Sequence, residues 1–412
     1  MGIVTAPVAG RPAGTAPAIG LTTPRRRRAR WVPPLMAVAV VLLIGGLWEG
    51  LVYLGLPLAA GQHSLHVDHG PLMVLGFLGT LIALERAVAL GPAWSYLAPA
   101  GAAVGGLAVT CNAPNGVGQA VVTLGGVILV AIFVAVHRIQ ASLHNVVLAS
   151  GAICWVVAGV LWVANWDIPR FIPWLAGFLV LTITGERLEL SRLTGRSRRA
   201  EVLFVGAAGL FLAGLIVSLF AEATGVRIAG TGLCCLAAWL ARYDIARRTV
   251  RGHGITRYMA IALLTGYAWL VVGGALWLDI GRMSFADLGR SAHGSAYDAM
   301  LHAVFLGFVI SMIFAHAPVI VPSVLGRPLP YNRWFYVPLV MLHVTLLLRL
   351  VGGDAMHNKV SWQWGGSLNE VALLLFVGLA AGAVIRAARS QRKAARPPQP
   401  ANGSAQEARQ AT

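Results

Sequence analysis

The chain has 412 residues, of which 57% are hydrophobic and only 11% charged, and its mean hydropathy of +0.73 excludes an ordinary soluble domain. Its formal net charge of +17 would suit a nucleic-acid partner, but the sequence has no basic folded domain that could bind one. We therefore expect an all-α polytopic membrane protein that contacts the lipid bilayer and no nucleic acid.

Long apolar segments follow one another along most of the chain. Residues 1–30 and 389–412 are rich in Ala, Pro, Gly, Arg and Gln, a composition typical of disordered tails. Between them, residues 31–388 are expected to form one transmembrane domain of about twelve helices with short connections. The expected spans are 31–56, 71–90, 94–111, 117–136, 145–163, 171–188, 202–220, 228–240, 258–278, 299–318, 335–351 and 368–385.

Basic residues predict the orientation of these spans. If the N-terminus is cytoplasmic, the loops and ends on that side carry 26 of the 32 Lys and Arg, the opposite side carries five, and Arg349 lies inside a span. This asymmetry follows the positive-inside rule and predicts that both termini are cytoplasmic. A bacterial inner (cell) membrane is the expected location, and the net charge is then explained by topology.

One phrase occurs three times within the expected helices. A Gly-Phe pair is followed, nine residues after the Gly, by an ionisable residue, in the copies Gly76-Phe77 with Glu85, Gly177-Phe178 with Glu186, and Gly307-Phe308 with His316. The copies fall on spans two, six and ten, which predicts an internal repeat of three four-helix units whose equivalent helices meet.

Glu85, Glu186 and His316 are therefore candidates for a proton relay or a polar layer. Ionisable side chains at membrane depth are costly unless they face the interior of a bundle, and all three are expected at a similar depth near the cytoplasmic face. An alternative interpretation makes Glu85-Arg86 and Glu186-Arg187 ordinary pairs at helix ends in the headgroup zone, where Arg reaches the interface.

Histidines gather near the opposite ends of spans two and ten. His63, His66 and His69 precede or begin span two, and His302 follows Asp298 by four residues on span ten. Imidazoles in such clusters are typical ligands of a metal ion or a haem. Small residues share a helical face with His69 along span two, which suits either a flat macrocycle or a closely packed helix.

Spans ten and eleven contain further imidazoles. His302 and His316 are fourteen residues apart, hence ~21 Å along a helix, so they cannot bind one metal ion together. His343 lies in the middle of span eleven and is a candidate ligand of a second cofactor, a relay group, or a hydrogen-bonded core residue.

The residues around His69 and His302 form two blocks that resemble a known family. The run HVDHGPLMVLGF, from His66 to Phe77, resembles the signature His-x-His-Glu-Met-Leu-Phe-Gly-Phe of the NnrS family, although Gly70 replaces the family Glu. A second signature of that family is similar to His302-Ala303 followed by Gly307, Met312 and Gly326-Arg327-Pro328. NnrS proteins are twelve-span membrane proteins that contain haem and copper and are linked to nitric oxide.

The resemblance implies redox or nitric-oxide-linked chemistry of a b-type haem, with a small diatomic ligand or an electron donor as partner. It implies His69 and His302 as haem ligands, Arg349 as a cation near the porphyrin edge, and copper as a candidate metal with His63, His66 and His343 as its possible ligands. Haem-copper oxidase subunit I also resembles this chain in its twelve helices and in its haem histidines on helices two and ten. Span seven lacks the His-His pair that a copper centre for oxygen chemistry needs.

Two other classes of function remain open. A proton or metal-ion transporter or channel would use Glu85, Glu186 and His316 as a relay and the outer histidines as an entrance, but spans two, six and ten have no Gly-Pro interruption near the midplane. An assembly factor without a cofactor would leave the histidines as loop residues. The sequence does not decide whether the protein is an enzyme, and it identifies no catalytic residue.

Overall fold

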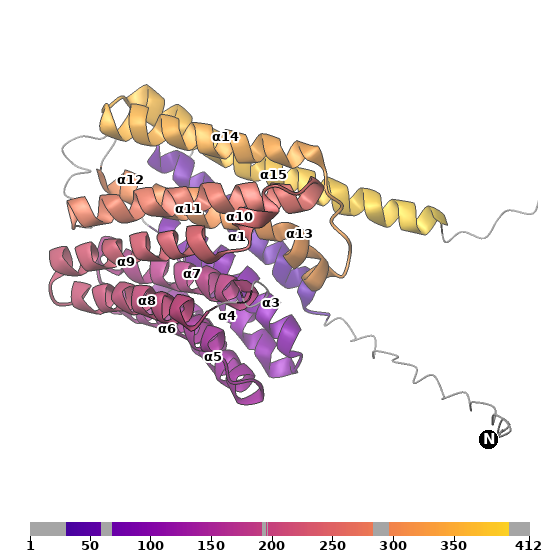
Figure 1. Ribbon diagram of the computed structural model, residues 1–412, viewed down its shortest axis with the longest axis horizontal. Helices are drawn as coiled ribbons and strands as arrows, with labels where there is room; N and C mark the ends of the chain where they lie inside the picture. The colour runs from indigo at the N-terminus through magenta and orange to yellow at the C-terminus, as the bar shows by residue number, and fades with distance from the viewer. Residues whose placement is uncertain (1–29, 59–67, 192–194, 196, 283–295, 395–412) are drawn as a thin grey trace, which may run out of the picture. The chain divides into compact units, whose positions relative to one another are not determined.

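The computed structural model describes residues 30–58, 68–191, 195, 197–282 and 296–394. Every regular element in these ranges is a helix, and none of them is a strand, so the predicted all-α class is confirmed. The long helices run roughly alongside one another (Figure 1). A helix pairs most of its backbone N–H and C=O groups within itself, as a lipid environment requires.

The helices of the first half begin and end at the following residues: α1 (Val32–Tyr53), α2 (His69–Pro71), η2 (Leu72–Leu78), α3 (Gly79–Leu90), η3 (Ala93–Tyr96), α4 (Leu97–Thr110), η4 (Pro114–Gly116), α5 (Val117–Ile139), α6 (Leu143–Val163) and α7 (Ile168–Leu190). The second half contains α8 (Arg198–Ser218), α9 (Glu222–Tyr243), α10 (Ala246–Thr249), α11 (Gly254–Ile280), α12 (Ala296–His302), η7 (Ala303–Ile310), α13 (Ser311–Leu325), η8 (Arg333–Phe335), α14 (Tyr336–Leu347), η9 (Leu348–Ala355) and α15 (Lys359–Ala394).

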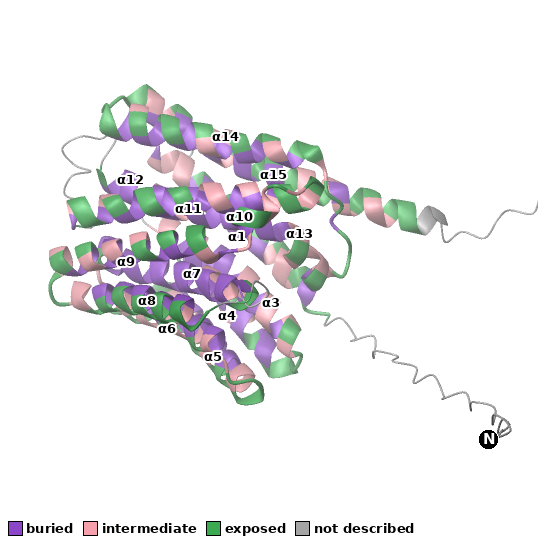
Figure 2. Cartoon of the chain, in the orientation of Figure 1, coloured by how far each residue is buried: buried purple, intermediate pink, exposed green. Residues whose placement is uncertain are grey.

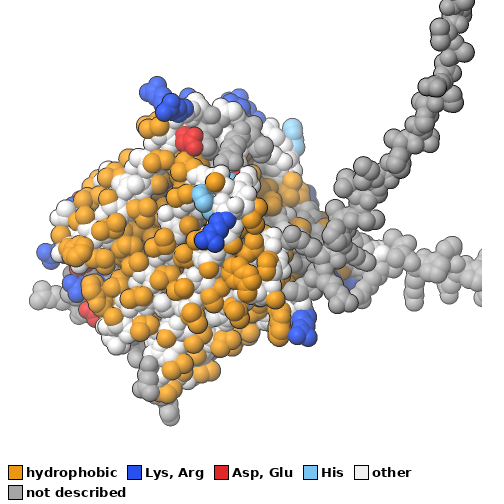
Figure 3. All heavy atoms as spheres, turned by 90° about the horizontal axis from the view of Figure 1, so that it is seen from below, with side chains coloured by type: hydrophobic (Ala, Val, Ile, Leu, Met, Phe, Trp, Pro, Cys, Tyr) orange, Lys and Arg blue, Asp and Glu red, His pale blue; other side chains and the backbone are white. Residues whose placement is uncertain are grey.

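The described residues contain eleven helices that are long and apolar enough to cross a membrane. The twelfth expected span is α4, which has 14 residues and is preceded by the short helix η3. The short span expected at 228–240 is part of a longer helix, α9, which has 22 residues. Hydrophobic side chains cover most of the face seen in Figure 3, as expected of a multi-pass membrane protein.

Helix α7 occupies the centre of the bundle. In its most apolar window 94% of the residues are buried, more than in the other candidate spans of the described chain. It packs against both η2 and η7, and α3 packs against α13. Figure 2 shows α7 almost entirely in the colour of buried residues. The three helices that carry the repeated Gly-Phe phrase therefore meet in the interior.

Two of those three helices contain a π-helical segment that the third lacks. Segment η2 follows His69 closely, and η7 follows His302 directly. The carbonyl groups of Gly76 and Gly307 each accept a hydrogen bond of 2.6 Å from a hydroxyl four residues later, on Thr80 and Ser311. Regular helix α7 has Leu181 at the equivalent position. π-helical segments concentrate at functional sites. Spans two and ten contain such a segment next to His69 and His302, where a site is expected, and span six does not.

Candidate functional site

Five side chains form a polar cluster where α2, α12, η9 and α15 come together, and we call it the histidine layer: His69, Asp298, His302, Arg349 and Trp362. Asp298, Arg349 and Trp362 are buried, and the two imidazoles are partly buried. Asp298 is its centre. Arg349 donates from Nε and Nη2 to the two oxygens of Asp298, both at 2.8 Å, and Trp362 Nε1 donates to Oδ2 at 3.2 Å. This planar, two-point pairing compensates both charges away from water.

The two imidazoles of the histidine layer are oriented in the same way. His69 donates from Nδ1 to the carbonyl of Gly46 at 2.7 Å, and His302 donates from Nδ1 to the carbonyl of Asp298 at 2.9 Å. Within the described chain no hydrogen bond engages Nε2 of either ring. The two rings are close enough to interact electrostatically. A fixed Nδ1–H leaves Nε2 as the coordinating atom, which is how metal-ligating histidines are commonly held.

Glu370 lies beside His69, and a second carboxylate, Glu49, is buried one residue before Gly50 on α1. A methyl group added at Gly50 would meet Glu370 Oε1 at 2.7 Å and His69 Cε1 at 3.2 Å, so both side chains rest against this glycine. Glu49 is buried, and its Oε2 has no hydrogen-bond partner among the described residues. Asp68, just before α2, interacts electrostatically with Glu49, and burial raises the pKa of Asp68 above its ordinary value.

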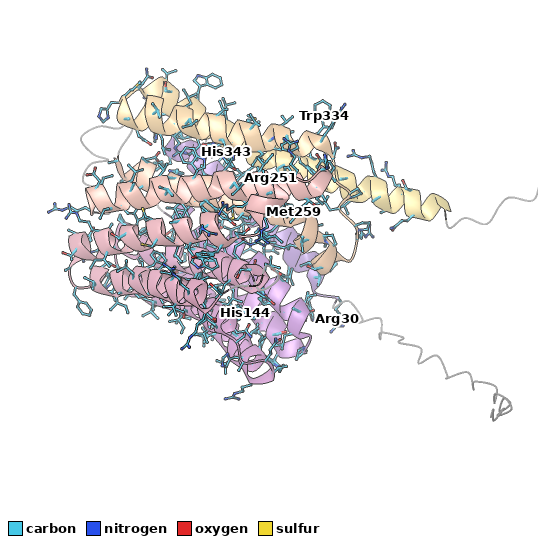
Figure 4. The ribbon with its side chains drawn as sticks, viewed as in Figure 1. Arg30, His144, Arg251, Met259, Trp334 and His343 are labelled. Atoms are coloured by element: carbon cyan, nitrogen blue, oxygen red, sulfur yellow. The ribbon has the colours of Figure 1, made fainter. Side chains whose placement is uncertain are left out.

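His343 is not part of the histidine layer. Trp269 on α11 donates from Nε1 to His343 Nδ1 at 3.0 Å. The proton of the neutral ring is therefore on Nε2, which is buried and has no partner in the described chain. Figure 4 labels His343 on the ribbon of α14. The Trp269 contact blocks Nδ1 as a ligand, and metal binding through Nε2 would require loss of its proton.

A second cluster, which we call the carboxylate layer, contains Glu85, Arg86, Glu186, Arg187 and His316. Arg86 on α3 forms ion pairs with Glu85 at 3.4 Å and with Glu186 on α7. His316 on α13 donates from Nδ1 to the carbonyl of Met312 at 2.5 Å and accepts from Arg187 Nη2 at 2.5 Å. The layer therefore joins the three helices of the repeated phrase, and each carboxylate faces an arginine.

Arg187 extends the carboxylate layer toward the end of α9. Its Nη1 lies 3.9 Å from Asp244 Oδ2, and Tyr267 on α11 interacts with both side chains. Asp244 also accepts a hydrogen bond of 2.7 Å from the backbone N–H of Ala246. Burial raises the pKa of Asp244, while Arg187 and the Ala246 amide act in the opposite direction.

The structure thus places six of the sequence candidates in two layers, and His343 lies in neither. Glu85, Glu186 and His316 come together, as the repeat predicted, and His69 lies with His302. His63 and His66 lie outside the described residues. Arg86 and Arg187 bridge helices, which the alternative interpretation as local pairs at helix ends did not anticipate.

Sequence reasoning missed several residues that lie beside the candidates or contact them: Glu49, Asp244, Trp269 and Glu370. Glu49 and Glu370 had a usable signal, since each is a lone carboxylate inside an otherwise apolar span. Asp244 and Trp269 had none, because their roles depend on which helices become neighbours. Across the described ranges, no group of three or more His, Cys, Asp or Glu side chains is arranged to hold a metal ion.

Fold and layers together define a polytopic helical membrane protein with ionisable side chains in its interior. The chain belongs to the family described as a domain of unknown function (DUF8744), whose model matches residues 31–385. The matched region begins at the first residue before α1 and ends within α15, so it contains both layers. No curated protein matches the chain.

Proposed function

We propose that this protein binds a b-type haem through His69 and His302 and is a bacterial inner-membrane protein of NnrS type with redox or nitric-oxide-linked chemistry. The observation that carries the proposal is the matched orientation of the two imidazoles. Each ring is held by its Nδ1–H on a backbone carbonyl, and each keeps Nε2 free of hydrogen bonds within the described chain. Such second-shell contacts fix the tautomer in which Nε2 can ligate iron.

A haem suits this ligand set better than a bare metal ion. The described residues offer two oriented imidazoles but no group of three metal-binding side chains. Protein sites for copper or zinc need three or four protein ligands, whereas porphyrin supplies four of the six ligands of haem iron. Copper stays in the proposal only as a second metal, with His63, His66 and His343 as candidate ligands.

Each side chain of the histidine layer has a distinct role under this proposal. Asp298 positions His302 through its carbonyl and holds Arg349 through its carboxylate. Arg349 uses Nε and Nη2 on Asp298, which leaves Nη1 as a donor for a haem propionate. A bound haem would supply electron transfer with both imidazoles in place, and a position for a diatomic gas where one imidazole is lost.

The test is a reduced-minus-oxidised visible spectrum with pyridine haemochrome quantification on the purified full-length protein. We expect a stoichiometric b-type signal that His69→Ala and His302→Ala each abolish. His343→Ala is the matched control, since it removes another intramembrane imidazole and should retain the haem. Equal haem content in the His69 and His302 variants and in the parent protein would refute the ligand assignment.

A second candidate function is a proton or metal-ion relay through the carboxylate layer. A further lone carboxylate outside that layer supports it: Glu49 is buried inside α1, its Oε2 has no hydrogen-bond partner among the described residues, and such a group is a typical proton-binding site. Against it, Arg86 already compensates both Glu85 and Glu186. Flux in proteoliposomes distinguishes the two functions: a relay predicts that Glu85→Gln blocks flux in a protein that contains no haem.

A further inference from the structure

We infer that a pocket of four arginines at the ends of α9 and α10 is a binding site for a phosphate-bearing anion. The pocket has a volume of about 490 Å³ and lies at the end of the bundle nearest the carboxylate layer. Its lining includes Ser197, Arg242, Asp244, Arg247, Arg248 and Arg251. Figure 4 labels Arg251, which follows α10. None of these arginines belongs to the proposed haem site, so the two proposals stand or fall separately.

The positive charge of the pocket is not compensated by carboxylates of the described chain. None of the four arginines forms an ion pair with a carboxylate of the described residues. Arg247 donates to the backbone carbonyl of Arg242 at 3.2 Å, and the Arg242 guanidinium lies 5.2 Å from the ring centre of Tyr243. All four side chains are exposed. Their guanidinium groups are therefore free to bind an anion.

Asp244 is the acidic residue in the pocket lining, but its carboxylate contacts groups other than the four arginines. Its carboxylate accepts the backbone N–H of Ala246 at 2.7 Å and faces Arg187 at 3.9 Å, on the side of the carboxylate layer. It is almost completely buried, whereas the arginines are exposed. Asp244 therefore fixes the start of α10, and through it the positions of Arg247 and Arg248, without neutralising them.

Helix α8 adds donors to the same pocket. Ser197 is the N-cap of this 21-residue helix, and its Oγ accepts the N–H of Ala200 at 3.2 Å. The hydroxyl proton of Ser197 is left for a ligand, and the first turn of the helix presents further N–H groups. The positive end of the helix dipole favours an anion at this position.

Phosphate is the anion that this donor set fits best. Guanidinium groups bind phosphate through two parallel N–H···O contacts, and several of them around one pocket match a group that carries more than one negative charge. The adjoining ends of α7 at Leu190 and α9 at Tyr243 place the pocket at the membrane boundary, on the side that the basic loops predict to be cytoplasmic. A lipid headgroup and a soluble phosphate compound share this chemistry.

The experiment measures both sources with the full-length protein in detergent. Isothermal titration with inorganic phosphate tests the soluble source, and native mass spectrometry with phosphatidylglycerol or phosphatidylcholine tests the lipid source. The variant is Arg247→Gln with Arg248→Gln, both at exposed positions, and Arg251→Gln alone is the second variant if the double change alters elution or helicity. Arg138→Gln is the matched control, because Arg138 is an exposed arginine at the end of α5 outside the pocket.

We expect the double variant to bind at least about tenfold more weakly, because each arginine near an anionic surface contributes severalfold. The control should bind as the parent protein does. Phosphate binding without a preference for phosphatidylglycerol identifies a soluble ligand, and retention of phosphatidylglycerol over phosphatidylcholine without phosphate binding identifies a lipid. Equal binding by the parent and the double variant, or binding of neither probe by the parent, overturns the inference.

Discussion

Arg86 on α3 pairs with Glu186 on α7, one hundred residues further along the chain. The same guanidinium lies 3.4 Å from Glu85, so one arginine serves the ionisable residues of two copies of the repeated phrase. His316 of the third copy is held by Arg187, the neighbour of Glu186. The carboxylate layer thus links α3, α7 and α13 through ion pairs and hydrogen bonds. We therefore expect the loss of one of its side chains to lower the stability of the helix bundle.

Arg86→Met should destabilise the protein by about 2 kcal/mol, because it leaves two largely buried carboxylates without their cation. Adding Glu186→Gln to this variant removes one of those charges and should recover part of the loss. The measurement is reversible unfolding in mixed detergent for the parent, both single variants and the double variant. Arg138→Gln, at an exposed position, should change stability by no more than about 0.5 kcal/mol.

The account is contradicted if the free-energy losses of the two single variants add up to the loss of the double variant, since additivity means that the residues do not interact. A double variant that is less stable than Arg86→Met would contradict it as well.

The helices themselves were predictable because lipid permits few alternatives. Uninterrupted apolar stretches of about 20 residues can satisfy their backbone only as helices, and the span boundaries follow from that. The π segments were not predictable, since they depend on local packing. A partial signal exists in hindsight: Gly76 and Gly307 are each followed four residues later by a hydroxyl, and Gly177 is not.

The partners of the candidate residues were harder to predict than the residues. The spacing of the repeat was enough to expect Glu85, Glu186 and His316 in one layer. Nothing local indicated that Trp269 would cap His343 or that Arg349 would pair with Asp298 across 51 residues. Such pairs depend on which helices become neighbours around α7, and that arrangement cannot be predicted from a single sequence.

Asp298→Asn should weaken haem binding in the proposed site by roughly 10- to 100-fold, as losses of second-shell contacts do. The change removes the charge that holds Arg349 and one contact of 3.2 Å to His302 Nδ1, while the backbone carbonyl of residue 298 still orients the ring. Haem titration of the apoprotein gives the affinity. Asp279→Asn, an exposed carboxylate near the end of α11, is the control that should bind haem normally. Normal affinity in Asp298→Asn would remove Asp298 from the site.

Gly307→Ala should destabilise the protein by about 1–3 kcal/mol through overpacking. A methyl group at Gly307 would meet Cγ of Trp269 at 2.5 Å, so η7 would have to move away from α11. Gly209→Ala in α8 is the matched control, because no atom lies within 4 Å of its added methyl group. The control should be neutral or slightly more stable, since alanine favours helices over glycine. Equal melting temperatures for the two variants would show that η7 tolerates the displacement.

The titration of Asp244 should make stability fall as the pH rises above about 4. Burial raises the pKa of this carboxyl from its ordinary value of 3.8, so the folded protein binds the proton more tightly than the unfolded chain does. The stabilisation is therefore complete below pH 3.8 and is lost as the pH rises through the higher pKa of the folded state. The groups that face Asp244 are Arg187, Tyr267 and the N–H of Ala246, with the pocket arginines beyond them.

Asp244→Asn tests this sign directly, because asparagine keeps the shape and cannot ionise. Melting temperatures of the parent and the variant should converge at acidic pH, apart from a constant offset, and the parent should lose more stability than the variant as the pH rises. If Arg187 dominated the environment instead, the pKa of Asp244 would be lowered, and the parent would gain stability relative to the variant over the same interval. The slope of the difference between the two melting curves therefore decides whether burial or the ion pair controls this carboxylate.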